Sequence, residues 1–450
     1  MKLPAKVSLG AVIRHSQSPT NLVAITYVIE NGIRLVSSLV LTRLLAPEAY
    51  AVMGLVTSLA FVITMLTDVG FQAFMLRHER LSERAFREAM WTTRFVRSCL
   101  LGILFFSVAE PLGAWLQKPE AIFALQIFSL TFLLDGLVPI SNITALIDNR
   151  LRRYCIIDIA MSISNFAIGF LWAWYYPNIY SLIYAGLVSQ VLRIAFFRIL
   201  LPDSFLVWAI DLSIVKELIK FSRYIIGSSI ITIILLQVDK IGLSRVIETD
   251  RLGAYFLAAA IAAIPRGLVG ALSSKSLYPA YARFAAKSDR YDSSELYKSR
   301  KILDVLFPLV CSLGLLASTW MIELFYDPRY SEAGRFLSIL FLGLVPLFWN
   351  SAINDFLVAG GWTSTTFKSN VVRLVWVLAV PLPFLFYERP MVFLILMALT
   401  EFVAYLYLLF RLKRLGVIRL RNELVCIGIA LSSIILFGFS FLPSFEAIPS

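Results

Sequence analysis

The sequence LTRLL at residues 41–45 is followed by a short polar turn and then by YAVM at 50–53. The same arrangement returns about 200 residues further on, as LSRVI at 243–247 and LGAY at 252–255. Each copy ends one apolar segment, makes a tight turn and enters the next apolar segment without a gap. A repeat at this spacing predicts two similar bundles of six helices that keep the same orientation.

The composition indicates an integral membrane protein. The 450 residues are 59% hydrophobic and only 16% charged, whereas a soluble domain is about 45–50% apolar and about 25% charged. The apolar residues fall in long blocks, which excludes an ordinary cytosolic enzyme, a disordered chain and a secreted disulfide scaffold. The four cysteines lie in apolar runs without a CxxC partner, so neither a disulfide framework nor a metal site is indicated.

Thirteen segments are apolar enough to cross a bilayer, which requires about 20 residues for each helix. Together with the repeat they predict an all-α integral membrane protein with two six-helix bundles around a central cavity. The expected parts are an N-terminal lobe at 1–201, a cytoplasmic linker at 202–220, a C-terminal lobe at 221–412 and an extra helix at 424–442. The expected spans are 22–45, 50–74, 91–109, 121–147, 154–176, 178–200, 222–246, 252–274, 302–325, 334–359, 367–387, 391–412 and 424–442.

The charges of the loops predict a cytoplasmic N-terminus. In this orientation about 25 Lys and Arg residues fall in inside segments, and only Lys118, Arg251, Arg329 and Arg389 fall in outside loops. The same bias accounts for the net charge of +12, so a nucleic-acid partner is not expected. No signal peptide is expected either, because the first 20 residues lack a cleavable apolar core.

Ionisable side chains at membrane depth are costly, so each is a candidate functional group. In the first half, Glu30 and Arg34 share a helix face and form either a structural salt bridge or a substrate contact. Asp68 could brace the basic loop that follows it. Asp135 lies near Pro139. A proline at this depth leaves backbone groups without their helical hydrogen bonds, so they need partners from neighbouring protein or from a water-filled cavity.

The second half carries a denser polar segment. Gln237, Asp239 and Lys240 place three polar side chains within four residues at the middle of one span. A lipid-facing helix would not hold them, so we expect them to face a water-accessible cavity or neighbouring helices. Because Asp239 and Lys240 are adjacent, they stand about 100° apart on a helix and cannot share one face.

Further polar residues indicate the chemistry of this cavity. Asn350 and Asn354 are spaced to share one face of a later span. Arginines would make the cavity cationic and suited to a phosphate-bearing or otherwise anionic substrate. The arginines expected to line it are Arg34, Arg43, Arg245 and Arg266.

The sequence lacks the motifs of common membrane enzymes. It contains no Walker A sequence, no GxSxG elbow and no HExxH motif. His15 and His78, the two histidines, are both expected near the cytoplasmic surface and cannot form a metal pair. The outside loops are about ten residues or shorter, too short for a catalytic domain. These absences favour movement of a substrate over its conversion.

Several stretches occur together in an order and spacing that resemble one family of transporters. The stretches are LTRLLAPEAY at 41–50, DVGF at 68–71 followed by Arg77, VDKI at 238–241, LGAY at 252–255, Pro265 and YPAYAR at 278–283. Over about spans 1–12 the chain is similar to the polysaccharide transporter family of the multidrug/oligosaccharidyl-lipid/polysaccharide exporter superfamily. That family includes O-antigen and exopolysaccharide flippases. Ala51 departs from it, because the family usually has Gly after the Pro-x-x-aromatic turn.

The resemblance implies a flippase of the bacterial inner membrane. It would move an undecaprenyl-diphosphate-linked oligosaccharide to the periplasmic face by alternating access, for O-antigen or exopolysaccharide synthesis. The implied partners are this lipid-linked oligosaccharide, membrane lipid, a polysaccharide polymerase and a chain-length regulator. No cofactor is implied, but a Na⁺ or H⁺ gradient could drive transport. Asp68, Asp135 or Asp239 could carry the ion, and Glu30 and Lys240 are further candidates for coupling or gating.

Two other classes remain open. A drug or cation antiporter of the same superfamily would share the two-lobed fold, but it would need a cavity rich in carboxylates. A membrane polysaccharide polymerase or ligase would share the hydrophobicity, but it would need a large periplasmic loop.

The predicted orientation can be tested by thiol labelling of single cysteines in a variant whose four native cysteines are replaced by serine. Because the positive charge is concentrated in 77–87 and 275–301, cysteines at 283–298 should resist a membrane-impermeant reagent in intact cells, and cysteines at 327–332 should react. Permeabilised cells are the control for reactivity. Labelling of 283–298 in intact cells contradicts the orientation.

Overall fold

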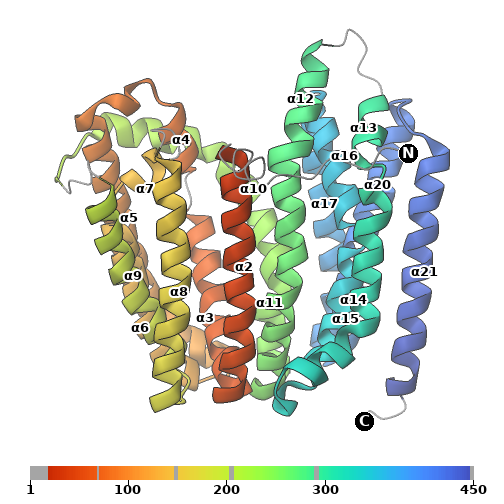
Figure 1. Cartoon of the computed structure of the whole chain (residues 1–450), viewed down its shortest axis with the longest axis horizontal. Helices are drawn as coiled ribbons and strands as arrows, with labels where there is room; N and C mark the ends of the chain where they lie inside the picture. The colour runs from red at the N-terminus through yellow and green to blue at the C-terminus, as the bar shows by residue number, and fades with distance from the viewer. Residues whose placement is uncertain (1–18, 68–69, 146–149, 202–206, 288–292, 446–450) are drawn as a thin grey trace, which may run out of the picture. The chain divides into compact units, whose positions relative to one another are not determined.

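The computed structural model describes residues 19–67, 70–145, 150–201, 207–287 and 293–445, and each described element is a helix (Figure 1). In this part of the chain, eleven helical segments are long and apolar enough to cross a membrane. They coincide with eleven of the expected spans. The other two expected spans, 22–45 and 222–246, fall in α2 (Pro19–Leu44) and α10 (Leu212–Val246). The prediction of an all-α membrane protein is confirmed.

The contacts divide the chain into two compact units. Unit 1 comprises Met1–Leu44 and Thr67–Ile225, and unit 2 comprises Leu45–Leu66 and Ile226–Ser450. Residues 45–66, which the sequence places in the N-terminal lobe, are thus grouped with the second half. The lobe boundaries at 1–201 and 221–412 stay a prediction.

Unit 1 consists of helices whose apolar faces pack pairwise, with α2 against α8 and α5 against α6. Its elements are α2, α4 (Phe71–Arg77), η1 (Glu79–Ser82), α5 (Arg84–Trp115), α6 (Glu120–Leu137), α7 (Ser141–Thr144), α8 (Leu151–Tyr175), α9 (Ser181–Leu200) and the first part of α10.

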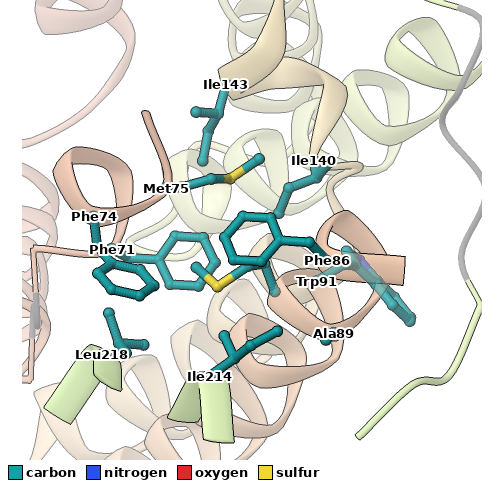
Figure 2. Packing of buried hydrophobic residues seen from close by; sticks show 11 residues of the cluster. Phe71, Phe74, Met75, Phe86, Ala89, Trp91, Ile140, Ile143, Ile214 and Leu218 are labelled. Carbon is teal, nitrogen blue, oxygen red and sulfur yellow. The ribbon is translucent and has the colours of Figure 1, made fainter. Parts of the chain in front are cut away.

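A buried apolar cluster joins the short helices of unit 1 to the beginning of α10 (Figure 2). Asp211 caps α10, because its carboxylate accepts hydrogen bonds from the backbone N–H groups of Ser213 and Ile214 at 2.9 and 3.4 Å. A hydrogen bond from the Ser213 hydroxyl, with these backbone bonds, holds the pKa of Asp211 below its ordinary value. The cluster consists of Phe71, Phe74, Met75, Phe86, Ala89, Met90, Trp91, Ile140, Ile143, Ile214 and Leu218.

Unit 2 holds the remaining helices. Helix α11 continues into α12 through a π-helical turn, η2, a type of irregularity that often marks functional sites. The elements are α3 (Pro47–Leu66), the rest of α10, α11 (Thr249–Leu272), η2 (Ser273–Leu277), α12 (Tyr278–Lys287), α13 (Ser294–Arg300), α14 (Leu303–Phe325), η3 (Pro328–Tyr330), α15 (Ala333–Leu344), α16 (Leu347–Ala359), α17 (Thr363–Ala379), α18 (Pro383–Phe386), α19 (Pro390–Ala398), α20 (Thr400–Arg414) and α21 (Leu420–Phe445).

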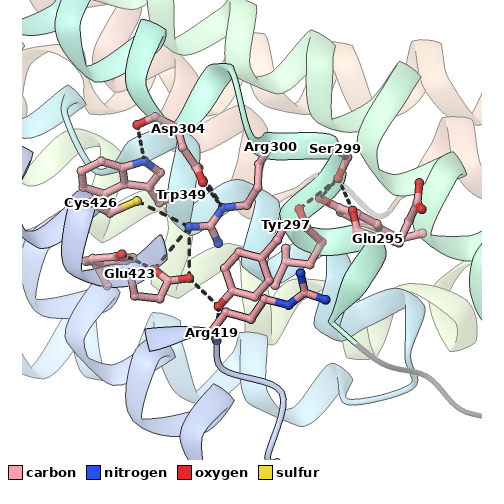
Figure 3. Close-up of polar contacts among 12 residues, drawn as sticks. Glu295, Tyr297, Ser299, Arg300, Asp304, Trp349, Arg419, Glu423 and Cys426 are labelled. Carbon is pink, nitrogen blue, oxygen red and sulfur yellow. Dashed lines mark hydrogen bonds and ion pairs between the residues drawn. The ribbon is translucent and has the colours of Figure 1, made fainter. Parts of the chain in front are cut away.

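The extra C-terminal helix, α21, is fixed to unit 2 by a buried ionic network (Figure 3). Arg300 is fully buried, and its Nε donates to both carboxylate oxygens of Asp304 at 2.7 and 2.8 Å. Its Nη2 lies 3.2 Å from Glu423 on α21. The hydroxyls of Tyr297 and Tyr405 also donate to Glu423. Paired in this way, the buried charges hold α21 against α13, α14 and α20.

The two copies of the sequence repeat meet in unit 2, where α3 packs against α11. A Cβ added at Gly253 would lie 1.9 Å from the carbonyl oxygen of Pro47. A side chain at 253 would therefore collide with the backbone of α3. Because glycine has none, the two helices can approach closely, as small residues allow in membrane helix bundles. Next to this contact the Tyr330 hydroxyl donates to the Leu45 carbonyl at 3.1 Å.

Replacing Gly253 should therefore disturb the α3–α11 contact. We expect Gly253→Ala to destabilise the protein by about 1–3 kcal/mol, as overpacking does in cores, because the methyl group meets backbone and not a mobile side chain. The measurement is the thermal unfolding midpoint of the detergent-purified protein. Gly270→Ala is the matched control, since nothing lies within 4 Å of a Cβ added there. Equal midpoints for the two variants would contradict this account of the packing.

Candidate functional site: a polar pocket in unit 2

Unit 2 encloses a pocket of about 230 Å³ among α10, α11, α15, α17, α19 and α20. Its lining mixes apolar side chains with charged and hydrogen-bonding groups. Most of the helices that supply these groups are long and apolar enough to cross a membrane, so we place the charges at membrane depth. Such groups are stable there only when paired or hydrated. The polar residues of the lining are Thr232, Asp239, Tyr255, Arg266, Asn370, Arg373, Thr400 and Glu401.

Asp239 enters this pocket from α10. One of its carboxylate oxygens accepts a hydrogen bond from the hydroxyl of Tyr255, which is fully buried on α11. The other oxygen, Oδ1, is buried and has no hydrogen-bond partner among the described residues. A buried carboxylate oxygen that accepts no hydrogen bond is unfavourable, and binding a proton or a cation would stabilise it.

Glu401 and Arg373 form a closed ion pair on another wall of the pocket. Arg373 Nη2 lies 2.9 Å from Glu401 Oε2, and its Nη1 donates to Asn370 Oδ1 at 2.9 Å. Asn350 Nδ2 donates to the same Glu401 oxygen at 2.7 Å. These bonds tie α16, α17 and α20 together, so this pair has the geometry of a structural brace.

Arg266 differs from Arg373 in its bonding. Its side chain, on α11, is exposed in the pocket and interacts electrostatically with Glu401 and Tyr255. Within the described residues its guanidinium makes no hydrogen bond. The formal charges of Asp239, Glu401, Arg266 and Arg373 cancel, and Arg266 is the member whose donors remain available to a ligand.

The structure brings some of the predicted second-half residues together. Asp239 and Arg266 line the pocket, and Asn350 bonds to its wall. Gln237 is buried on α10 outside the lining. Lys240 turns back on its own helix, where its Nζ donates to the Leu236 carbonyl at 2.7 Å. Asp239 and Lys240 thus have different surroundings, in keeping with their angular separation.

The other second-half residues lie elsewhere. Asn354 is half-buried on α16, and its Oδ1 has no hydrogen-bond partner among the described residues. Arg245 is exposed in the last turn of α10.

The predicted first-half residues belong to unit 1 or lie outside the description. Arg34 is exposed on α2 and makes no hydrogen bond within the described chain, whereas Arg43 is exposed in the last turn of α2. Glu30 is half-buried and interacts electrostatically with Arg34. Asp135 pairs with Arg94 at 3.0 Å. Asp68 lies outside the described residues. The roles proposed for these residues from the sequence stay predictions.

Sequence reasoning missed Arg373 and Glu401. Both were visible as ionisable residues inside expected spans 367–387 and 391–412, and that signal alone makes a residue a candidate. Tyr255 was also missed as a pocket residue, because a tyrosine in an apolar helix carries no comparable signal. All three residues share the pocket lining with Asp239, and Tyr255 donates a hydrogen bond to it.

The fold is that of known membrane transporters. The structure of the lipid II flippase MurJ in an inward closed conformation superposes with a TM-score of 0.71 over 96% of this chain and 93% of MurJ, at 16% identity. An inward-facing multidrug resistance MATE family transporter of the MOP superfamily gives a TM-score of 0.63 over 87% of this chain and 94% of that protein, at 14% identity. The chain is thus a multi-pass helical membrane protein with a transporter fold.

The sequence comparison then gives the family. Residues 40–334 match the polysaccharide biosynthesis protein family, and the chain belongs to that family. The succinoglycan biosynthesis transport protein ExoT of Rhizobium meliloti (strain 1021) is 23% identical over 314 residues, which are 69% of this chain and 62% of ExoT. The matched region therefore spans less than two thirds of that relative. The family predicted from the quoted stretches is confirmed.

The two arginines of the pocket should respond differently to substitution. Arg373→Ala leaves the half-buried Glu401 without its bonded cation and should destabilise the protein by up to about 3 kcal/mol, the lower end of the cost of breaking a buried pair. Arg266→Ala should change the thermal unfolding midpoint little, because Arg266 makes no hydrogen bond. The double variant Arg373→Ala/Glu401→Ala should recover part of the lost stability. If Arg266→Ala lowered the thermal unfolding midpoint more than Arg373→Ala, then Arg266 would be the structural brace and Arg373 the cation available to a ligand.

Proposed function

We propose that the protein is a flippase that carries diphosphate-lipid-linked oligosaccharides across the bacterial inner membrane for polysaccharide synthesis. The observation that carries this proposal is Arg266, a cation exposed in a membrane-depth pocket with no hydrogen bond within the described chain. Membership of the polysaccharide biosynthesis family and the MurJ-like fold support the same function.

The physical problem explains the need for such a residue. A sugar and a diphosphate cannot cross about 30 Å of hydrocarbon unaided, because every polar group would lose its water. Arginine replaces that water with a fork of N–H donors matched to phosphate oxygens. Arg266 would hold the diphosphate in this way, while the lipid tail stays in the bilayer. Alternating access would then expose the head group on the other face.

Coupling to an ion gradient forms part of the proposal. Of the two candidate aspartates that the structure describes, Asp239 has the surroundings better suited to carry H⁺ or Na⁺, because its buried Oδ1 has no donor among the described residues. Asp135 is less suited, because Arg94 already neutralises it at 3.0 Å. A proton or sodium ion at Asp239 would remove a negative charge close to the anionic substrate.

The alternatives fit the pocket less well. A drug or cation antiporter shares this fold, so the fold does not separate the two functions. A cationic substrate would need net negative charge, but both carboxylates in the pocket are matched by arginines. A polymerase or ligase would need an outside catalytic loop, and the sequence offers outside loops of about ten residues or fewer.

The deciding experiment locates the lipid-linked repeat unit in cells that carry Arg266→Ala in place of the native protein. We expect the complete, unpolymerised unit to accumulate on the cytoplasmic face, where a glycosidase added to spheroplasts does not reach it. Lys413→Ala is the control, since it removes an exposed cation at the end of α20. A unit that the glycosidase digests extensively would instead indicate a polymerase or ligase. Unchanged glycan intermediates with new sensitivity to cationic drugs would indicate an antiporter.

A further inference from the structure

Unit 1 contains a second group of membrane-depth charges, apart from the pocket of unit 2. It lies where α2 and α9 pack against α8. Asp158 on α8 faces Arg193 on α9, and Glu30 on α2 interacts electrostatically with Asp158, Arg34 and Arg193. The formal charges of these two carboxylates and two arginines cancel. None of the motifs in the sequence drew attention to Asp158 or Arg193.

Arg193 is held loosely within this group. Its Nη2 lies 3.7 Å from Asp158 Oδ1, which is too long for a hydrogen bond. Its guanidinium lies 5.7 Å from the ring centre of Phe197, one turn along the same helix. Its Nε is buried without a hydrogen-bond partner, although 32% of the side chain is exposed. In the described chain, none of the five donors of Arg193 makes a hydrogen bond.

Three other arginines show what a purely structural pair looks like in this protein. Arg94 donates to Asp135 at 3.0 Å, and Arg373 donates to Glu401 at 2.9 Å. Arg300 donates to both oxygens of Asp304 at 2.7 and 2.8 Å. Each of these arginines has the short, charge-assisted bonds that repay the burial of a charge. Arg193 has none, so bracing does not account for its geometry.

The carboxylate of Asp158 is better satisfied than its partner. It interacts with the hydroxyl of Tyr154, one turn earlier on α8, as well as with Arg193. Asp158 therefore neutralises Arg193 without occupying its donors. An oxyanion with two or three accessible oxygens would offer Arg193 the short bidentate contacts that Asp158 does not make.

We propose that Arg193 binds a phosphoryl oxygen of the transported diphosphate lipid, and that Asp158 is the counter-ion that it releases when the substrate enters. This inference rests on the proposed function and adds a substrate contact within unit 1. The loose ion pair keeps Arg193 neutralised while the site is empty, and the pair opens readily because it contains no hydrogen bond. Asp158 then competes with the substrate for the same guanidinium.

Because Asp158 competes with the substrate for Arg193, replacing the two residues should change the affinity for substrate in opposite directions. The test uses the purified full chain in nanodiscs of zwitterionic lipid and measures the dissociation constant of undecaprenyl diphosphate. Arg193→Gln should weaken binding about tenfold, the effect of losing one charge-assisted contact. Asp158→Asn should tighten binding severalfold, because it removes the competitor and nearly preserves the shape. Lys413→Gln, which removes one positive charge as Arg193→Gln does but at an exposed position in the last turn of α20, should bind as the native protein does.

Several outcomes would overturn the inference. A structural pair would make both variants bind more weakly and unfold earlier, and Arg193→Lys, which keeps the charge, would then restore both stability and diphosphate affinity. Equal effects on phosphatidylglycerol and on undecaprenyl diphosphate would show a general attraction for anionic lipid. If Arg266→Gln weakens binding and Arg193→Gln does not, this inference fails and the proposed function stands. If the native protein does not bind undecaprenyl diphosphate, both fail.

Discussion

The constraint that shapes this protein is the cost of a charge in hydrocarbon. A charged side chain at membrane depth must find an opposite charge, a set of hydrogen-bond partners or water. In the described part of the chain, Arg94–Asp135 and Arg373–Glu401 meet this need by pairing charges from two different helices. On the short helix α13, Arg300 is paired in the same way with Asp304 and Glu423. Each pair links the helices that carry its members.

Within this common rule, the arginines fall into two kinds. Arg300 and Arg373 each place two nitrogens in hydrogen bonds to protein carboxylates or amides, although one further nitrogen of each has no partner in the described chain, and these pairs fix helices. Arg266 and Arg193 are neutralised by nearby carboxylates but keep their donors unused. Electrostatic neutralisation and hydrogen bonding are thus separate in this protein. A transporter for an anion needs that separation, because a cation satisfied in both ways would have nothing to offer a substrate.

The sequence predicted which residues lie at membrane depth better than it predicted which residues they pair with. Hydropathy predicted the helices closely. Asp239 and Arg266, two of the residues predicted to line a cavity, lie in the lining of the pocket of unit 2, and their roles stay predictions. Arg373 and Glu401 are 28 positions apart on different helices, and their pairing depends on rotations that hydropathy does not report. The same limit applies to Asp158 and Arg193. Counting loop charges and apolar spans shows only how deep a residue lies in the membrane. An ion pair also requires that the two helices turn the faces carrying the charged residues toward each other.

The contact between Gly253 and Pro47 has a consequence for how this chain can change. The two positions belong to equivalent turns of the internal repeat, and the carbonyl oxygen of one occupies the space in which the other would have a side chain. The limit is one-sided, because the backbone of Pro47 excludes a side chain at 253. A residue with a side chain could therefore appear at 253 only together with a change elsewhere that lets α3 and α11 move apart.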